Sequence, residues 1–192
     1  MNLQPKEKIL GVEAVTDSNN IGILTKQGRM LLFPAGEIRP MGKTAGGVKA
    51  IDLQDEHDEV ASLFLHKEEP FILIHSDKNG KLLSLEDLRI RKRAKKGQVV
   101  MTGKETIEGG ISIIEGAVRI RFDDGSMKTL HSNDIRLDEP ETPLHHMVDQ
   151  HIDVIYRPRE EKEENVKYKE EKKKAEKGDS LFDIPDSEVA DD

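Results

Sequence analysis

The residues best suited to chemistry form a basic run between Arg89 and Lys96. Six of its eight side chains are cationic: Arg89, Arg91, Lys92, Arg93, Lys95 and Lys96. Closely spaced cations on a loop attract phosphates and release the counterions that are condensed on a nucleic acid. The run therefore predicts contact with a DNA backbone. The alternative is a solvated charged face that has no specific ligand.

Four earlier cations are secondary candidates for the same contact: Arg29, Arg39, Lys43 and Lys49. Arg39 ends a triplet of an acidic, an aliphatic and an arginine residue. This triplet occurs three times, as Glu37-Ile38-Arg39, Asp87-Leu88-Arg89 and Asp134-Ile135-Arg136. Because an acid accompanies the arginine each time, a structural ion pair is the alternative to DNA contact at Arg39.

The net charge of −8 opposes DNA binding, but it is unevenly distributed. The segment from Arg159 to Asp192 has 13 acidic and eight basic residues, so it carries −5 and residues 1–158 carry −3. Attraction to phosphates depends on local patches more than on the total charge. The acidic composition therefore does not exclude a nucleic-acid partner.

The elements that must hold these cations are expected to be short β-strands. Three pairs of apolar runs flank the turn signals Gln27-Gly28, Asn79-Gly80 and Asp124-Gly125. Glycine supplies the positive φ that tight hairpin turns require. The three glycines are 52 and 45 residues apart, and the recurring triplet follows each of them after seven to nine residues. A period near 45–50 residues with about four strands per unit is typical of β-propellers.

We therefore predict an all-β chain, a partial β-propeller of about three four-stranded blades followed by a disordered charged tail. The blades are expected at about residues 8–65, 66–115 and 116–140, with the last one degraded. Residues 141–158 are expected to form a linker or closing segment, and residues 159–192 a disordered acidic tail. Leu181 to Pro185 is a small apolar island, for which a docking peptide is the alternative to plain tail.

Three other patterns give weak signals for a site. Gly42-Lys43-Thr44 lacks the upstream glycine of a phosphate-binding loop, because Glu37 occupies that position. His145, His146 and His151 with Asp149 do not have the spacing of a common metal site. The acidic stretch from Asp55 to Glu59 is interpreted as a turn. We expect no cofactor and no metal.

The stretch from Gly28 to Leu53 resembles a blade of the C-terminal domain of bacterial type IIA topoisomerase A subunits (DNA gyrase and topoisomerase IV). Blades of this family carry a turn glycine, Glu-aliphatic-Arg, Gly-basic, Gly-Val and a closing apolar strand. Residues 79–97 resemble the blade that follows. The resemblance implies a β-pinwheel with a basic rim, around which duplex DNA bends.

In gyrase-type members of this family, the box Gln-Arg-Arg-Gly-Gly-Lys-Gly anchors DNA wrapping. The nearest segment here is Arg91 to Gly97, which keeps Arg93, Lys96 and Gly97. It has Arg91 in place of the glutamine, and Ala94 and Lys95 in place of the two glycines. The segment resembles a degenerate copy of the box. It supports DNA bending more than chiral wrapping.

The resemblance also implies that this chain is not an enzyme on its own. Strand cleavage in the family uses a tyrosine of a separate helical domain, whereas Tyr156 and Tyr168 lie in or near the tail. The implied partners are double-stranded DNA, the B subunit of the topoisomerase, and the remainder of its A subunit, in the cytoplasm at the nucleoid and not at a membrane. The alternative is a protein-interaction module that pairs through open blade edges.

Overall fold

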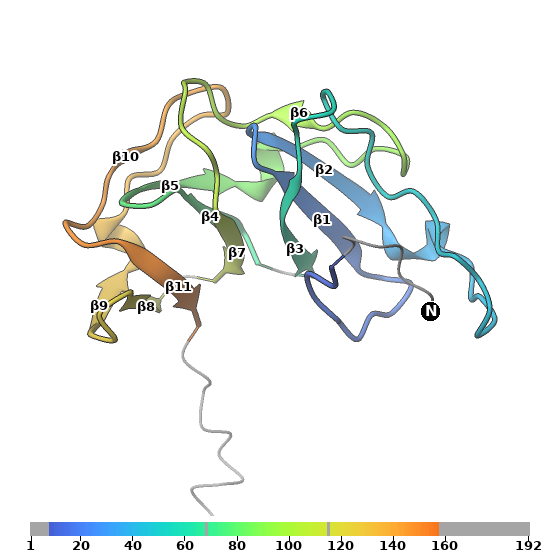
Figure 1. Ribbon diagram of the computed structural model, residues 1–192, viewed down its shortest axis with the longest axis horizontal. Coiled ribbons are helices and arrows are strands. Elements are labelled where there is room, and N and C mark those ends of the chain that lie inside the picture. The colour runs from blue at the N-terminus through green and yellow to red at the C-terminus, as the bar shows by residue number, and fades with distance from the viewer. Residues whose placement is uncertain (1–7, 68, 115, 158–192) are drawn as a thin grey trace, which may run out of the picture. The chain divides into compact units, whose positions relative to one another are not determined.

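The computed structural model describes residues 8–67, 69–114 and 116–157 (Figure 1). In this part of the chain every long element is a β-strand, arranged in three antiparallel sheets. The expectation of an all-β, propeller-like fold is confirmed. The predicted acidic tail and its apolar island lie outside the described residues.

The first sheet has four strands, in the order β3-β1-β2-β6. Their bounds are Asn20–Thr25 for β1, Arg29–Pro34 for β2, Val60–His66 for β3 and Gln98–Val99 for β6. β1 and β2 are almost fully buried, which explains why they are continuous apolar runs and do not alternate with polar residues.

The second sheet repeats this order as β7-β4-β5-β10, and the third as β11-β8-β9 with three strands. The second sheet contains β4 (Phe71–His75), β5 (Asn79–Ser84), β7 (Gly109–Ile113) and β10 (His145–His146). The third contains β8 (Ala117–Phe122), β9 (Met127–His131) and β11 (Ile152–Tyr156). The strand after β9 that would complete the pattern is absent from the described residues.

A short 3-10 helix ends each inner hairpin and marks the repeat. These helices are η1 (Ala35–Glu37), η2 (Leu85–Asp87) and η3 (Ser132–Asp134). Each ends on the acidic residue of the recurring triplet, so the structural period is 50 and then 47 residues. The triplet is therefore a better marker of the repeat than the turn glycines.

The prediction that Gly80 is a turn glycine is wrong. Gly28 and Gly125 do lie in turns, with φ of 81° and 82°. Gly80 instead lies inside β5, where it pairs with His75 of β4 and with His145 of β10. The second hairpin turns at Asp77-Lys78, two residues earlier than the Asn-Gly pair suggests, because the Ser76 amide bonds to the Asn79 carbonyl and β5 begins at Asn79 itself.

The second and third sheets each contribute a segment to the sheet before them. Residues 88–101, which follow the hairpin of the second sheet, return to the first sheet, where β6 pairs with β2. Residues 135–148 return in the same way from the third sheet to the second, where β10 pairs with β5. We call residues 88–101 and 135–148 the second and third exchange segments. They cover strands that would otherwise be open edges.

Two apolar clusters join neighbouring sheets. One contains Leu24 and Phe64 of the first sheet together with Ile72 and Ile74 of the second. The other contains Leu73 of the second sheet with Ile120 of the third. Burying one such side chain contributes about 1.5–3 kcal/mol. The three sheets therefore share their cores with their neighbours.

Among the described residues, no helix has the length and apolar character that crossing a lipid bilayer requires.

Candidate nucleic-acid interface

The basic run occupies the second exchange segment, between η2 and β6. Its first half is held by backbone contacts to β2, in which Ile90 forms a parallel bridge with Leu32. The Arg91 amide donates to the Leu32 carbonyl at 2.8 Å. Because the backbone supplies these bonds, the cationic side chains remain available to solvent.

The tip of the run is a turn that is fastened to residues 37–52. The Arg93 amide donates to Glu37 Oε2 at 2.7 Å, and the Ala94 amide donates to the Ala50 carbonyl at 2.7 Å. Ala94 has a φ of 58°, which costs a residue with a Cβ about 1–2 kcal/mol. These amide bonds offset that cost and fix the direction in which the turn points.

Five of the six cations of the run have exposed side chains: Arg89, Arg91, Lys92, Lys95 and Lys96. Arg93 differs because it is half-buried and its Nη1 donates to the Lys49 carbonyl. Arg93 therefore helps to hold the loop, whereas its neighbours present charge.

Asp52 lies among these cations and partly compensates them. Lys49 donates a hydrogen bond to this carboxylate and, together with the charges of Lys96 and Lys95, holds the pKa of Asp52 below its usual value. The Asp52 amide also donates to the Lys95 carbonyl at 3.1 Å. The fold thus brings Lys49 to the end of the run, from which it is about 45 residues distant in sequence.

The other secondary candidates occupy different environments. Arg29 is half-buried and its Nη1 donates to the Gly97 carbonyl at 2.9 Å, so it ties β2 to the residue just before β6. Arg39 and Lys43 are exposed on the segment after η1. Neither forms an ion pair within the described ranges, whereas the corresponding Arg136 pairs with Asp138 at 2.9 Å. In the third copy the arginine thus pairs with Asp138, which lies outside the triplet, whereas the triplet residue Asp134 accepts a hydrogen bond from the His131 amide.

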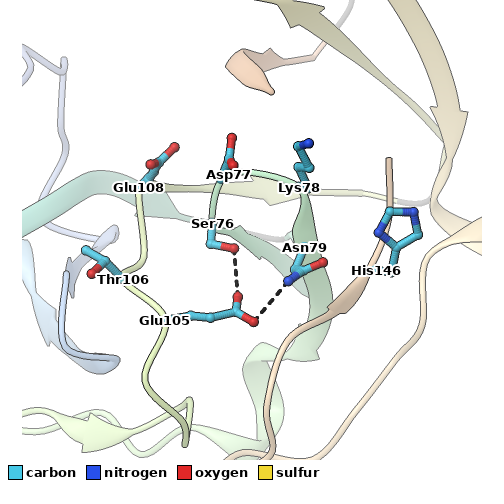
Figure 2. Close-up of a pocket in the computed structure, with 8 residues that line it drawn as sticks. All are labelled: Ser76, Asp77, Lys78, Asn79, Glu105, Thr106, Glu108 and His146. Carbon is cyan, nitrogen blue, oxygen red and sulfur yellow. Dashed lines mark hydrogen bonds between the residues drawn. The ribbon is translucent and has the colours of Figure 1, made fainter. Parts of the chain in front are cut away.

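A hollow beside the second hairpin is acidic and unsuited to phosphate (Figure 2). Glu105 accepts hydrogen bonds there from Ser76 Oγ at 2.8 Å and from Asn79 Nδ2 at 2.9 Å. These bonds fasten the segment before β7 to the β4–β5 turn. The residues that line the hollow are Ser76, Asp77, Lys78, Asn79, Glu105, Thr106, Glu108 and His146.

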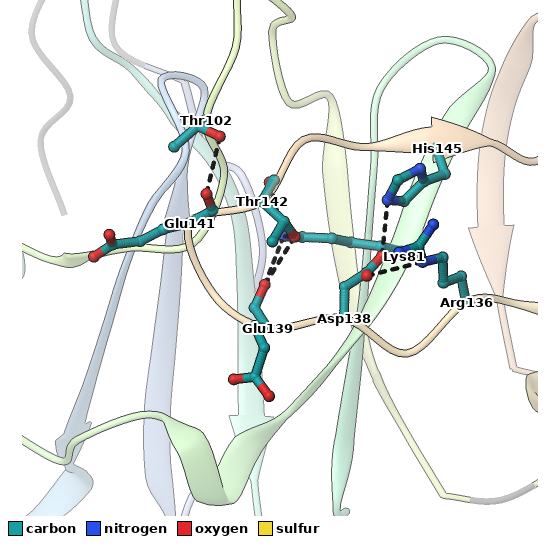
Figure 3. A network of polar contacts seen from close by, with 8 residues as sticks. All are labelled: Lys81, Thr102, Arg136, Asp138, Glu139, Glu141, Thr142 and His145. Atoms are coloured by element: carbon teal, nitrogen blue, oxygen red, sulfur yellow. Dashed lines mark hydrogen bonds and ion pairs between the residues drawn. The ribbon is translucent and has the colours of Figure 1, made fainter.

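The third exchange segment is acidic where the second is basic (Figure 3). It is anchored by Lys81, which is fully buried in β5. Lys81 Nζ donates to the carbonyls of Glu139 at 3.2 Å and Thr142 at 2.9 Å, and to Thr142 Oγ1 at 2.7 Å. Burial lowers the pKa of Lys81, and the charge of Asp138 opposes this. Lys81 is thus a structural cation that cannot reach a ligand.

The three histidines considered as metal ligands contact separate carboxylates. His145 lies 3.0 Å from Asp138, His146 lies 3.0 Å from Asp149, and His151 pairs with Asp77. No group of three potential ligands gathers within the residues that the structure describes.

Comparison with solved structures defines the class of fold. The chain is similar to the C-terminal domain of DNA topoisomerase IV with a TM-score of 0.77 at 20% identity, covering 90% of this chain and 57% of that one. A second neighbour is the DNA gyrase A C-terminal domain, with a TM-score of 0.67, 18% identity and coverage of 83% and 57%. The architecture is therefore that of a topoisomerase C-terminal β-pinwheel.

Sequence comparison gives the same family. Residues 21–67 and 79–120 match the family described as DNA gyrase C-terminal domain, beta-propeller. The DNA gyrase A protein of Chlamydia pneumoniae is 36% identical over 84 residues, which are 43% of this chain and 10% of the relative. That of Deinococcus deserti is 29% identical over 115 residues, or 59% of this chain and 13% of the relative. The chain thus spans only a small part of these relatives.

Proposed function

We propose that this chain binds duplex DNA without sequence specificity, bends it, and thereby assists a type II topoisomerase in changing DNA topology. It acts as a non-catalytic domain, together with a B subunit and with the rest of an A subunit, at the nucleoid in the cytoplasm. The match to the gyrase C-terminal domain family supports a role in DNA wrapping.

One observation carries the proposal at the level of residues. Five exposed cations, Arg89, Arg91, Lys92, Lys95 and Lys96, project from a single exchange segment whose backbone is fixed to the first sheet. A pre-fixed loop loses little conformational freedom on binding, so more of the phosphate attraction appears as affinity. Lys49 adds to these cations, because it shares the Asp52 carboxylate with the charges of Lys95 and Lys96. Arg39 and Lys43, which are exposed on the segment after η1, are proposed as further contacts. Arg93 and Arg29 contribute by holding the loop.

The mechanism is electrostatic. Phosphate contacts position a duplex but carry no sequence information directly. Bending a short site costs on the order of 1–6 kcal/mol by elastic estimates, which the cationic contacts must offset.

A salt titration of duplex binding tests the proposal. Lys95→Gln with Lys96→Gln should weaken binding and reduce the log–log salt slope by about 0.9 for each phosphate contact that is lost. The matched control is Lys104→Gln with Lys128→Gln, which removes two exposed cations outside the run and should leave the slope unchanged. Equal effects of the two pairs, or no binding at low salt, would refute the proposal.

A further inference from the structure

The three sheets differ in how their inner edge strands are covered. β2 is covered by the second exchange segment, and β5 by the third, so that Leu32 and Leu82 are only 1% and 4% exposed. The corresponding strand of the third sheet is β9, whose residues are almost all exposed. Within the described part of the chain, nothing pairs with the outer edge of β9.

The chain also contains an exchange segment that covers no strand. Residues 38–51 follow η1 as the other exchange segments follow η2 and η3, and we call them the first exchange segment. Residues 39–49 are exposed except for Ala45, and Val48 is 46% exposed. The corresponding stretch of the second segment, around Gly97, is buried or half-buried against β2. In the described part of the chain, the first blade thus has an exchange segment that covers no strand, and the third blade has a strand, β9, that no segment covers.

The repeat gives the register in which the two would pair. Positions can be counted from the acidic residue of each triplet, which is Glu37, Asp87 or Asp134. In both observed exchanges, the residue seven positions before one of these acids pairs with the residue eleven positions after the next one. These pairs are Met30 with Gln98 and Gly80 with His145. At the free ends these positions are Met127 and Val48. The same rule places Lys49 opposite Ser126, beside the exposed carboxylate of Asp124.

A second set of contacts gives the same register. The Arg91 amide donates to the Leu32 carbonyl at 2.8 Å, and the Asp138 amide donates to the Leu82 carbonyl at 3.0 Å. At the free ends, the corresponding bond would join the Met41 amide to the Thr129 carbonyl. The Leu82 amide donates to the Arg136 carbonyl at 2.8 Å, so by the same rule the Thr129 amide would donate to the Arg39 carbonyl. These bonds use Arg39 and Met41, the residues on either side of Pro40. Pro40 is therefore compatible with this pairing, although it has no N–H to donate.

We propose that two copies of this chain place their first exchange segments on each other's β9 and close a ring of six blades. The first exchange segment and β9 belong to the first and the third sheet, at the two ends of the blade series; β9 is at the lower left and the first sheet at the right of Figure 1. One twofold axis then satisfies both free ends of both copies, and it closes an interface that would otherwise continue as a polymer. Pairing also removes two exposed strand edges.

Engineered disulfides test the register. The chain has no cysteine, so Val48→Cys with Met127→Cys introduces the only thiols. Residues directly opposite each other on antiparallel strands have Cβ atoms about 4.5–5.5 Å apart, which approaches disulfide geometry. Mild oxidation of the full chain should give a covalent dimer of twice 21.6 kDa. The control pair, Val48→Cys with Lys128→Cys, is one residue out of register and should cross-link far less.

The mass of the unmodified chain tests the assembly without DNA. Light scattering should give twice 21.6 kDa for the natural sequence. Thr129→Pro removes the outward amide of an edge strand, where proline is tolerated, and should give the monomer mass. Thr129→Ala keeps the amide and should remain dimeric. A monomeric natural chain, open polymers, or equal cross-linking of the two cysteine pairs would overturn the proposal, whatever the result of DNA binding.

Discussion

At the scale of single residues, His75 connects the stability of the second sheet to pH. It is 7% exposed, and its Nδ1 lies 3.0 Å from the Ser76 carbonyl, so the neutral ring must carry its proton on Nδ1. Burial lowers the pKa of His75, and the bond to Ser76 opposes this. Below about pH 6.5 the unfolded chain therefore takes up a proton that the folded chain takes up only at lower pH. Stability is lost as the pH falls through this window.

We predict that His75→Gln flattens the pH dependence of unfolding between pH 7 and pH 5. One proton bound only by the unfolded chain contributes a slope of at most about 1.4 kcal/mol per pH unit. Denaturant unfolding at a series of pH values measures this slope. His57→Gln, which changes a histidine whose side chain is 82% exposed, is the control and should retain the natural slope. Parallel curves for the natural chain and His75→Gln would contradict the prediction.

At the scale of elements, the exchange segments determine both the architecture and the basic surface. Ala94 is the strained position of the second segment, and Glu141 occupies the same place in the third with a φ of 66°. We predict that Ala94→Gly stabilises the chain by about 1 kcal/mol, because glycine adopts positive φ without the Cβ penalty. Ala117→Gly, at the first residue of β8, should instead destabilise it, because glycine loses more conformational freedom on folding than alanine. Thermal unfolding of both variants measures the two changes in stability. Destabilisation by Ala94→Gly would contradict the prediction for that position.

The hairpins and the recurring triplet could be predicted from the sequence because their signals are local. Apolar runs and glycines specify β1–β2 and β8–β9 within about 15 residues. The exchange could not be predicted, because β6 and β10 have two residues each and gain their stability from a strand about 70 residues earlier. The positions of Arg93 and Arg29 within the basic surface depend on these distant contacts. Charge composition alone therefore could not separate the cations that hold the loop from those that face solvent.

At the scale of the whole molecule, opposite charges are distributed between different parts of the chain. The second exchange segment is strongly basic, and the third contains Asp138, Glu139 and Glu141. Residues 159–192 add a further charge of −5. An acidic segment on the same chain has a high effective concentration near a basic loop. We therefore propose that it competes with DNA phosphates for the same cations.

We predict that removing residues 159–192 increases the affinity for duplex DNA at low salt. The increase should shrink as salt rises, because charges are screened beyond about 10 Å at 0.1 M ionic strength. A full-length chain with the acidic residues of this segment changed to Gln and Asn is the control that separates charge from length. Fluorescence anisotropy with a labelled duplex should show tighter binding for both variants. Unchanged affinity in the neutralised chain would show that the segment does not compete with DNA. The negative charge of residues 159–192 would then not affect DNA binding by the basic surface.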